Sequence, residues 1–177
     1  MSKKKNISMN INKLKAKISK LALKNRITKW DLGASCSIDS SVQVDKGSAK
    51  QMKGSQRSSV TVRVWNQKGL VGITSTSDLS DEGLAKALSG ANIASEYGNQ
   101  NEIPAFSPLA KSPLPDIDRP VQESQGIKKL FEVLKEAESS LLAKHPSINT
   151  VPYNGISESN SERFYLNSDG AHRHLVR

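Results

Sequence analysis

Apolar residues near the start of the chain recur at intervals of three and four positions, the spacing that keeps side chains on one face of an α-helix. The set is Ile7, Ile11, Leu14, Ile18 and Leu21. It predicts an amphipathic helix from about Asn10 to Arg26, with lysines on its other faces. We expect the apolar stripe to pack on the domain's own sheet and the lysines to be a solvated face, rather than a membrane or nucleic-acid surface.

Alternating apolar and polar residues follow, and this period of two predicts β-strands. Residues 32–45 suit one long strand or two short ones. Residues 60–65 and 71–73 predict the two strands of an antiparallel hairpin. The polar stretch 49–59 is weakly patterned, and a further edge strand is one interpretation of it.

Two more helices are predicted, over residues 80–97 and 124–144. The first begins at Asp78 or Ser80 as N-cap, and its first turn is acidic, which the helix dipole favours. Its expected buried face consists of Leu84, Leu88 and Ala91, flanked by Ala87 and Ala94, and these small residues allow a close approach to the sheet. The second has a broad apolar stripe of Ile127, Leu130, Phe131, Leu134, Ala137 and Leu141.

The remaining segments predict a connector and a last pair of strands. Residues 102–120 contain five prolines, which remove amide donors and disfavour regular structure. Residues 148–157 and 163–167 predict two strands separated by the turn SESNSE. The resulting fold class is α+β, with two layers: a mostly antiparallel sheet with helices packed on one face. We expect a disordered basic tail over residues 1–9 and a single domain over 10–177.

The formal net charge of +9 is concentrated at one end of the chain. Ten of the 26 Lys and Arg residues lie between Lys3 and Lys29, before the first acidic residue, which leaves sixteen basic against seventeen acidic residues elsewhere. The body is therefore nearly neutral. The single cysteine, Cys36, excludes an internal disulfide and suits a reducing compartment. No apolar run reaches the length of a membrane span, so we expect a cytoplasmic protein without membrane contact.

Candidate metal ligands and nucleophiles are few. His172 and His174 stand two positions apart, a spacing that places both on one face of a strand, but a third ligand is not apparent and we interpret them as surface residues. Nothing near Cys36 suggests a base that would lower its pKa, so we expect a small buried thiol. We assign no catalytic, cofactor-binding or metal-ligating residue.

Two further patterns also favour structural interpretations. Gly69 and Gly72 precede a Ser/Thr run, but no phosphate-binding lysine follows and the next helix begins with acidic residues that repel anions. Arg63 and Trp65 share a strand face, and an arginine lying over an aromatic ring is common for structural reasons.

The segment VTVRVWNQKGLVGITSTSDLSDEGLAKALSGANIASEY, residues 60–97, resembles the N-terminal domain of the TldD/PmbA family of bacterial peptidases. The shared features are the strand, the Gly-bearing turn, the element TSTSDLS and the Ala-rich helix, in that order. Weaker similarity extends from Lys13 to Gly170, where Asn167, Ser168 and Gly170 resemble the family's NS-x-G turn, in which Gly170 is able to adopt a positive φ.

The resemblance implies a role in proteolysis or peptide maturation by a heterodimeric cytoplasmic zinc metallopeptidase, historically also described as a modulator of DNA gyrase. The family's zinc motif, a His-Glu pair with a second His four positions later and a distant Cys, matches no position here. STSDLS before an Ala-rich helix is closer to the PmbA (TldE) branch, whose members lack the motif and act as partners of the metal-bearing subunit. We therefore expect a TldD-like catalytic subunit or a second copy as partner, and peptides as substrates.

Family members continue into a C-terminal domain, so the resemblance also implies a truncated chain. Two alternatives stay open. The basic first thirty residues suit a stand-alone nucleic-acid-binding module, which would bind DNA with steep salt dependence. The other alternative is a non-functional gene fragment, whose terminal strand would expose an unpaired sheet edge.

Overall fold

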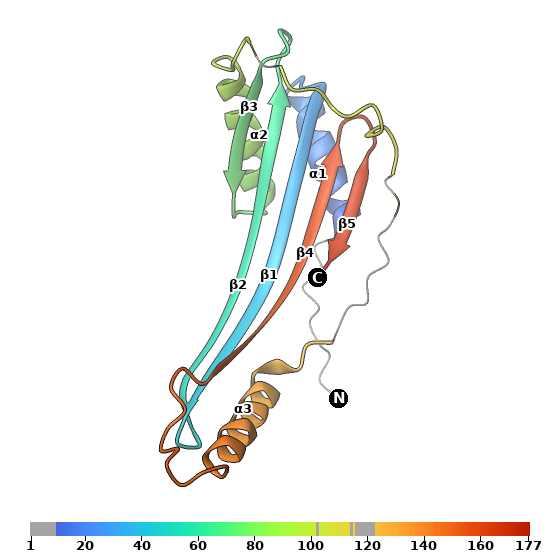
Figure 1. Ribbon diagram of the computed structural model, residues 1–177. Coiled ribbons are helices and arrows are strands. Elements are labelled where there is room, and N and C mark those ends of the chain that lie inside the picture. Colours follow the sequence, from blue (N-terminus) through green and yellow to red (C-terminus); the bar gives the residue numbers. More distant parts are fainter. Residues whose placement is uncertain (1–9, 102, 114, 116–122) are drawn as a thin grey trace. The chain divides into compact units, whose positions relative to one another are not determined.

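The structure, a computed structural model, describes residues 10–101, 103–113, 115 and 123–177. Its elements are α1 (Ile11–Lys24), β1 (Lys29–Asp45), β2 (Ser48–Trp65), β3 (Val71–Thr76), α2 (Asp81–Ser95), α3 (Gly126–Leu142), β4 (Gly155–Asn167) and β5 (His172–Val176). The strands form one antiparallel sheet in the order β3-β2-β1-β4-β5 (Figure 1). The predicted α+β class is confirmed.

The contacts between residues divide the chain into two compact units. Unit 1 comprises Met1–Cys36, Arg57–Arg119 and Glu162–Arg177, and unit 2 comprises Ser37–Gln56 and Pro120–Ser161. Strands β1, β2 and β4 contribute residues to both units. The expectation of a single domain over 10–177 stays a prediction, and the predicted tail 1–9 lies outside the described residues. The described part of the predicted connector, 103–113 and 115, contains no helix or strand.

In unit 1, α1 packs on the sheet as its pattern predicts. Leu14 and Ile18 are buried in a cluster with residues of β1, β2, β4 and α2. The helix begins at Asn10, whose side chain accepts a hydrogen bond from the Lys13 amide at 3.0 Å. Ile7 and the side chain of Ile11 lie outside the described part of the structure. The apolar stripe therefore serves the domain's own core.

Helix α2 lies against β3 at very short range. Its N-cap is Ser80, whose hydroxyl accepts from the Gly83 amide at 3.1 Å, so the predicted start is confirmed. Gly72 of β3 permits the contact, because a Cβ at this position would lie 1.9 Å from the carbonyl oxygen of Ala91. Small residues on both elements thus set the helix-to-sheet distance, as the Ala-rich pattern predicts.

The predicted hairpin is also confirmed. Strands β2 and β3 pair antiparallel from Val60 opposite Thr76 to Trp65 opposite Val71. The turn between them contains Gly69 with a φ of +80°, a left-handed conformation that glycine adopts readily. The polar stretch 49–59 is not a separate edge strand but the first part of β2, which shows that its weak apolar pattern hid a continuous strand.

In unit 2, α3 packs on strand residues through a small apolar cluster. Leu130 and Leu134 are buried against Val42 and Val44, with partly buried neighbours Ile127, Phe131 and Ile156. The prediction that the stripe extends to Ala137 and Leu141 is wrong, because both are exposed. Glu138 is buried in their place, since its carboxylate binds the backbone of the β1–β2 turn.

The prediction for the last strands is wrong in its placement of the turn. SESNSE lies inside β4, and residues 148–154 are not a strand. Polar side chains form hydrogen bonds within the sheet there, as Ser159 does with Asp39 at 2.6 Å, so a turn-like composition is compatible with a strand. The turn is the NS-x-G element, in which Gly170 has a φ of +102° and Asn167 accepts from the Ala171 amide.

Among the helices that the structure describes, none combines the length and the apolar character needed to cross a membrane. The cytoplasmic location itself stays an expectation from the sequence.

Candidate functional site

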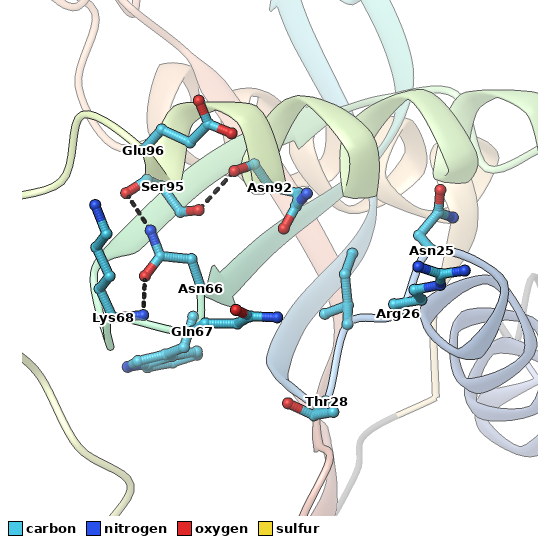
Figure 2. Close-up of a pocket in the computed structure, with 11 residues that line it drawn as sticks. Asn25, Arg26, Thr28, Asn66, Gln67, Lys68, Asn92, Ser95 and Glu96 are labelled. Carbon is cyan, nitrogen blue, oxygen red and sulfur yellow. Dashed lines mark hydrogen bonds between the residues drawn. The ribbon is translucent and has the colours of Figure 1, made fainter.

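A polar pocket of about 570 Å³ opens in unit 1, where the carboxyl ends of α1 and α2 meet the β2–β3 turn. Figure 2 shows its lining. The lining residues are Asn25, Arg26, Ile27, Thr28, Trp65, Asn66, Gln67, Lys68, Asn92, Ser95 and Glu96. Most of them carry side-chain hydrogen-bonding groups, so the pocket suits a polar ligand rather than an apolar one.

Asn66 holds one wall of the pocket in place. Its side-chain oxygen accepts from the amides of Lys68 at 2.9 Å and Leu70 at 3.0 Å, which closes the turn. Its side-chain nitrogen donates to the carbonyl oxygen of Ser95 at 3.0 Å, which ties the turn to the end of α2 (Figure 2). The buried Ser95 hydroxyl in turn donates to the Asn92 carbonyl. The turn and the helix end therefore form a fixed pair.

Arg26 stands in the opposite wall in an unusual conformation. Its φ is 56°, a left-handed value that glycine normally supplies at the end of a helix. The amides of Arg26 and Ile27 donate to the carbonyls of Leu23 and Ala22, which is the closing pattern of a helix C-terminus. A side chain kept at a position that favours glycine is a reason to look for a function there.

A second polar cluster lies on the sheet face that carries Arg63 and Trp65. Buried Asp31 accepts from the Nε of Arg63 at 2.8 Å and from a second guanidinium nitrogen, and the Tyr165 hydroxyl donates to it at 3.3 Å. The hydrogen bond to Asp31 raises the pKa of Arg63, and burial followed by the Asp31 charge raises the pKa of Tyr165. A buried carboxylate paired in this way is a structural centre.

Trp65 is covered by cations and by the connector. The Arg63 guanidinium lies 5.3 Å and the Lys29 ammonium 5.2 Å from the centroid of its ring. Its indole nitrogen donates to the Pro104 carbonyl at 2.6 Å, and the ring of Phe106 stands edge-on at 4.8 Å. The structural interpretation of the Arg63–Trp65 pair is confirmed, because the guanidinium lies over the ring and only 4% of Trp65 is exposed.

Cys36 is a buried thiol, as expected, with 5% of its surface exposed. Burial first, and then the charge of Glu162, raises its pKa, which makes it a poor nucleophile. His172 and His174 lie two positions apart on β5, so they face the same side, as the spacing predicts. His172 is partly buried and His174 is exposed. The His174 ring stacks on Phe164 at 4.4 Å, and its Nε2 lies 3.4 Å from a Glu162 oxygen.

The residues present do not fit the zinc that the family resemblance implies for a catalytic subunit. Within the described ranges, no group of three or more His, Cys, Asp or Glu side chains is placed to hold a metal ion. His145 lies apart from the other two histidines in sequence, and its Nδ1 accepts from the Ser147 amide at 3.1 Å. The expectation that this chain supplies no catalytic, cofactor or metal residue stays a prediction.

The glycines and lysines singled out by the sequence have structural surroundings. Gly72 faces the backbone of α2, which leaves no room for a phosphate above it. Lys17 of α1 forms an ion pair at 2.5 Å with Asp81 in the first turn of α2. Lys13, Lys20 and Lys24 are exposed, which agrees with a solvated cationic face.

No pattern in the sequence identified the pocket residues Arg26, Gln67 and Asn92. Helical periodicity and turn signals identified the elements that carry them, but a polar residue at a helix end or turn is ordinary in any sequence. Only the meeting of these ends in space distinguishes them.

Comparison with known proteins places this fold. Residues 30–94 match the sequence model of the family described as PmbA/TldA metallopeptidase domain 1. No curated protein matches the sequence. Among solved structures, a candidate modulator of DNA gyrase from Bacteroides thetaiotaomicron is similar with a TM-score of 0.68 and 18% identity, over 96% of this chain and 39% of that chain.

Two more solved structures share the fold. A candidate modulator of a DNA gyrase from Thermotoga maritima has a TM-score of 0.62 and 17% identity, over 94% of this chain and 37% of that chain. TldE from Thermococcus kodakarensis has a TM-score of 0.53 and 15% identity, over 93% and 36%. This chain spans little more than a third of the length of these proteins.

Proposed function

We propose that this chain, whose residues 30–94 match the first domain of the PmbA/TldA metallopeptidases, is the N-terminal part of a non-catalytic subunit of the PmbA (TldE) type. The resemblance of residues 60–97 to the TldD/PmbA family is confirmed by that match. The proposed role is to assemble with a TldD-like zinc subunit, or with a second copy, and to guide peptides toward a catalytic centre that the partner supplies.

The observation that carries the proposal is the match over residues 30–94. This range includes most of residues 60–97, the segment in which the order and spacing of strand, turn and helix are most specific to the family. The matched range contains β1 except its first residue, β2, β3, and α2 except its last residue. Within it, Gly72 and Ser80 fix the geometry of hairpin and helix. The similarity to TldE supports the same fold. The PmbA-type assignment rests on the STSDLS element before the Ala-rich helix.

The experiment separates a partner subunit from a self-sufficient enzyme. The purified chain is assayed for zinc by elemental analysis and for hydrolysis of an unfolded peptide, alone and after mixing with a TldD-type subunit. We expect less than stoichiometric zinc, no turnover alone, and co-elution with the TldD-type subunit in size-exclusion chromatography.

A matched pair of variants excludes contaminating activity. Stoichiometric zinc and turnover in the isolated chain, both lost in His174→Ala and retained in His145→Ala, would overturn the non-catalytic assignment. Failure to elute with a TldD-type subunit or with a second copy would overturn the assembly role. Turnover that neither substitution changes would be assigned to a contaminating peptidase. The chain itself would then be inactive alone, as expected.

A further inference from the structure

Free hydrogen-bonding groups in the polar pocket come from three different elements. In the described part of the chain, the side chains of Gln67, Asn92 and Arg26 make no hydrogen bond and no ion pair. Figure 2 shows the carboxamides of Gln67 and Asn92 extending from the turn and from α2 into the space that also borders Arg26. Two carboxamides offer both donors and acceptors to whatever enters.

The charges around the pocket nearly cancel, which decides what class of ligand fits. The lining contains two cations, Arg26 and Lys68, and one carboxylate, Glu96. The carboxyl ends of α1 and α2 also border it, and each helix end carries up to about half a negative charge. The excess positive charge is thus offset by the helix ends. A simple anion or cation finds little net opposite charge here to replace its hydration. A neutral dipolar group gains hydrogen bonds and has no charge to desolvate.

The pocket also lacks the platform that a nucleobase requires. Its aromatic residue, Trp65, is 4% exposed, and its ring is occupied by Lys29 and Arg63. Stacking on an aromatic ring contributes about 1–3 kcal/mol per base in proteins that bind single strands without sequence preference. This pocket does not provide such a ring.

We infer that this pocket binds a neutral segment of polypeptide main chain. The carboxamides of Gln67 and Asn92 pair with the C=O and N–H groups of the ligand, as backbone groups pair with one another in a sheet. The Arg26 guanidinium donates to a further carbonyl oxygen. The hydrogen bond between Asn66 and Ser95 holds the β2–β3 turn and the end of α2 at a constant separation. The entropic cost of ordering these two elements on binding is therefore small.

The test uses a capped tripeptide, N-acetyl-Gly-Ala-Gly-methylamide, titrated into the full isolated chain. Side-chain NH₂ resonances of Gln67 and Asn92 report binding by NMR. We expect saturable shifts at these groups, and at least about tenfold weaker binding of acetate and of tetramethylammonium, which carry charge without a peptide group.

Three variants sharpen the result. Gln67→Ala should weaken binding about 2- to 10-fold, the range for one lost hydrogen bond. Gln51→Ala, at an exposed position on β2, is the matched control and should leave it unchanged. Arg26→Gly should weaken binding while the fold is retained, because glycine accepts the positive φ at this position more readily than arginine does.

Absence of saturable shifts, equal binding of acetate, or equal loss in the Gln51→Ala control would overturn the inference. The titration needs no partner subunit, so it fails or succeeds independently of the proposed assembly role.

Discussion

The two units of the chain are stabilised in different ways. Among the residues that the structure describes, the apolar cluster of unit 1 contains sixteen buried residues, drawn from α1, α2, three strands and the turn after α1. The cluster of unit 2 contains four, from β1 and α3. Full burial of one large aliphatic side chain contributes about 1.5–3 kcal/mol. The apolar contribution in unit 2 is thus several times smaller, and other interactions have to hold α3 in place.

Carboxylates bound to backbone amides supply those interactions in unit 2. Glu138 accepts from the amides of Lys46 and Gly47 at 3.1 and 2.7 Å, which fixes the β1–β2 turn to α3. Glu158 of β4 accepts from the amides of Gln125 and Gly126, the first groups of α3. It replaces an N-cap, because Gln125 makes no capping side-chain bond. A small apolar cluster is thus supplemented by charge-assisted hydrogen bonds at both ends of one helix.

The largest effect is expected from opening a cavity in the core of unit 1. Leu88→Ala removes a side chain with 0% exposure, and its loss should lower the free energy of unfolding by about 3 kcal/mol. Leu141→Ala on α3, where the side chain is 48% exposed, should cost less than about 0.5 kcal/mol. Urea unfolding followed by circular dichroism compares them. Equal costs would contradict the burial difference between the two leucines.

A somewhat smaller loss is expected from separating α2 from β3. In Gly72→Ala the new Cβ would lie 1.9 Å from the Ala91 oxygen and 2.3 Å from the Ser95 nitrogen, both backbone atoms that cannot rotate away. The cost should be about 1–3 kcal/mol. Gly33→Ala on β1 is the control, since its Cβ meets nothing within 4 Å. If Gly72→Ala leaves the free energy of unfolding unchanged in the same urea titration, β3 and α2 do not approach as closely as the structure shows.

Removing the charge of Glu138 tests how much its hydrogen bonds to the β1–β2 turn stabilise unit 2. Glu138→Gln should destabilise unit 2 by about 1–2 kcal/mol, because a charge-assisted pair of hydrogen bonds is weakened. Hydrogen exchange at the Gly47 amide should accelerate, while that at Val62 in unit 1 should change little. Glu136→Gln, exposed two positions earlier on α3, provides the control. If both substitutions leave the Gly47 exchange rate unchanged, the Glu138 carboxylate does not stabilise the turn.

The smallest expected effect is a pH dependence of the stability of the first turn of α3. Burial raises the pKa of Glu158, but hydrogen bonds from Asn160, Ser124 and the Gly126 and Gln125 amides outweigh it and lower the pKa overall. Because the folded pKa lies below the unfolded value of about 4.3, the stabilisation is present above that pH and is lost as pH falls through the folded pKa.

Hydrogen exchange at the Gly126 amide should therefore become less protected between about pH 4.3 and lower values. Glu158→Gln should flatten this dependence, and Glu132→Gln, an exposed carboxylate of α3, should not. A pH profile that is the same in wild type and Glu158→Gln would assign the acid sensitivity to other groups.

Patterning along the chain was sufficient to predict unit 1 in some detail. Val60, Val62 and Val64 alternate because one face of β2 is buried, and Leu14 and Ile18 recur because α1 has one buried face. Ser80 was among the predicted caps. Each of these signals is local, since it reflects a period of two or of 3.6 residues and a side chain bonding to a nearby amide.

Unit 2 departed from its pattern where polar residues acted over long distances in sequence. Glu138 lies 92 positions from Lys46, and Ser159 lies 120 positions from Asp39. Such partners leave no periodic trace, so the pattern predicted Leu141 on the apolar face of α3 and a turn within β4, and it did not identify Glu138 as a buried residue. The pocket residues Arg26, Gln67 and Asn92 escaped prediction for the same reason.

The sequence by itself determined the α+β class, the resemblance to one peptidase family, and the buried faces of the helices and strands in unit 1, because each follows from neighbours in the chain or from an ordered motif. The tertiary structure alone decided which polar groups meet: the carboxylates that hold α3 and the carboxamides that line the pocket. Hydrogen bonds depend on distances between atoms, and folding sets those distances for residues far apart in the chain.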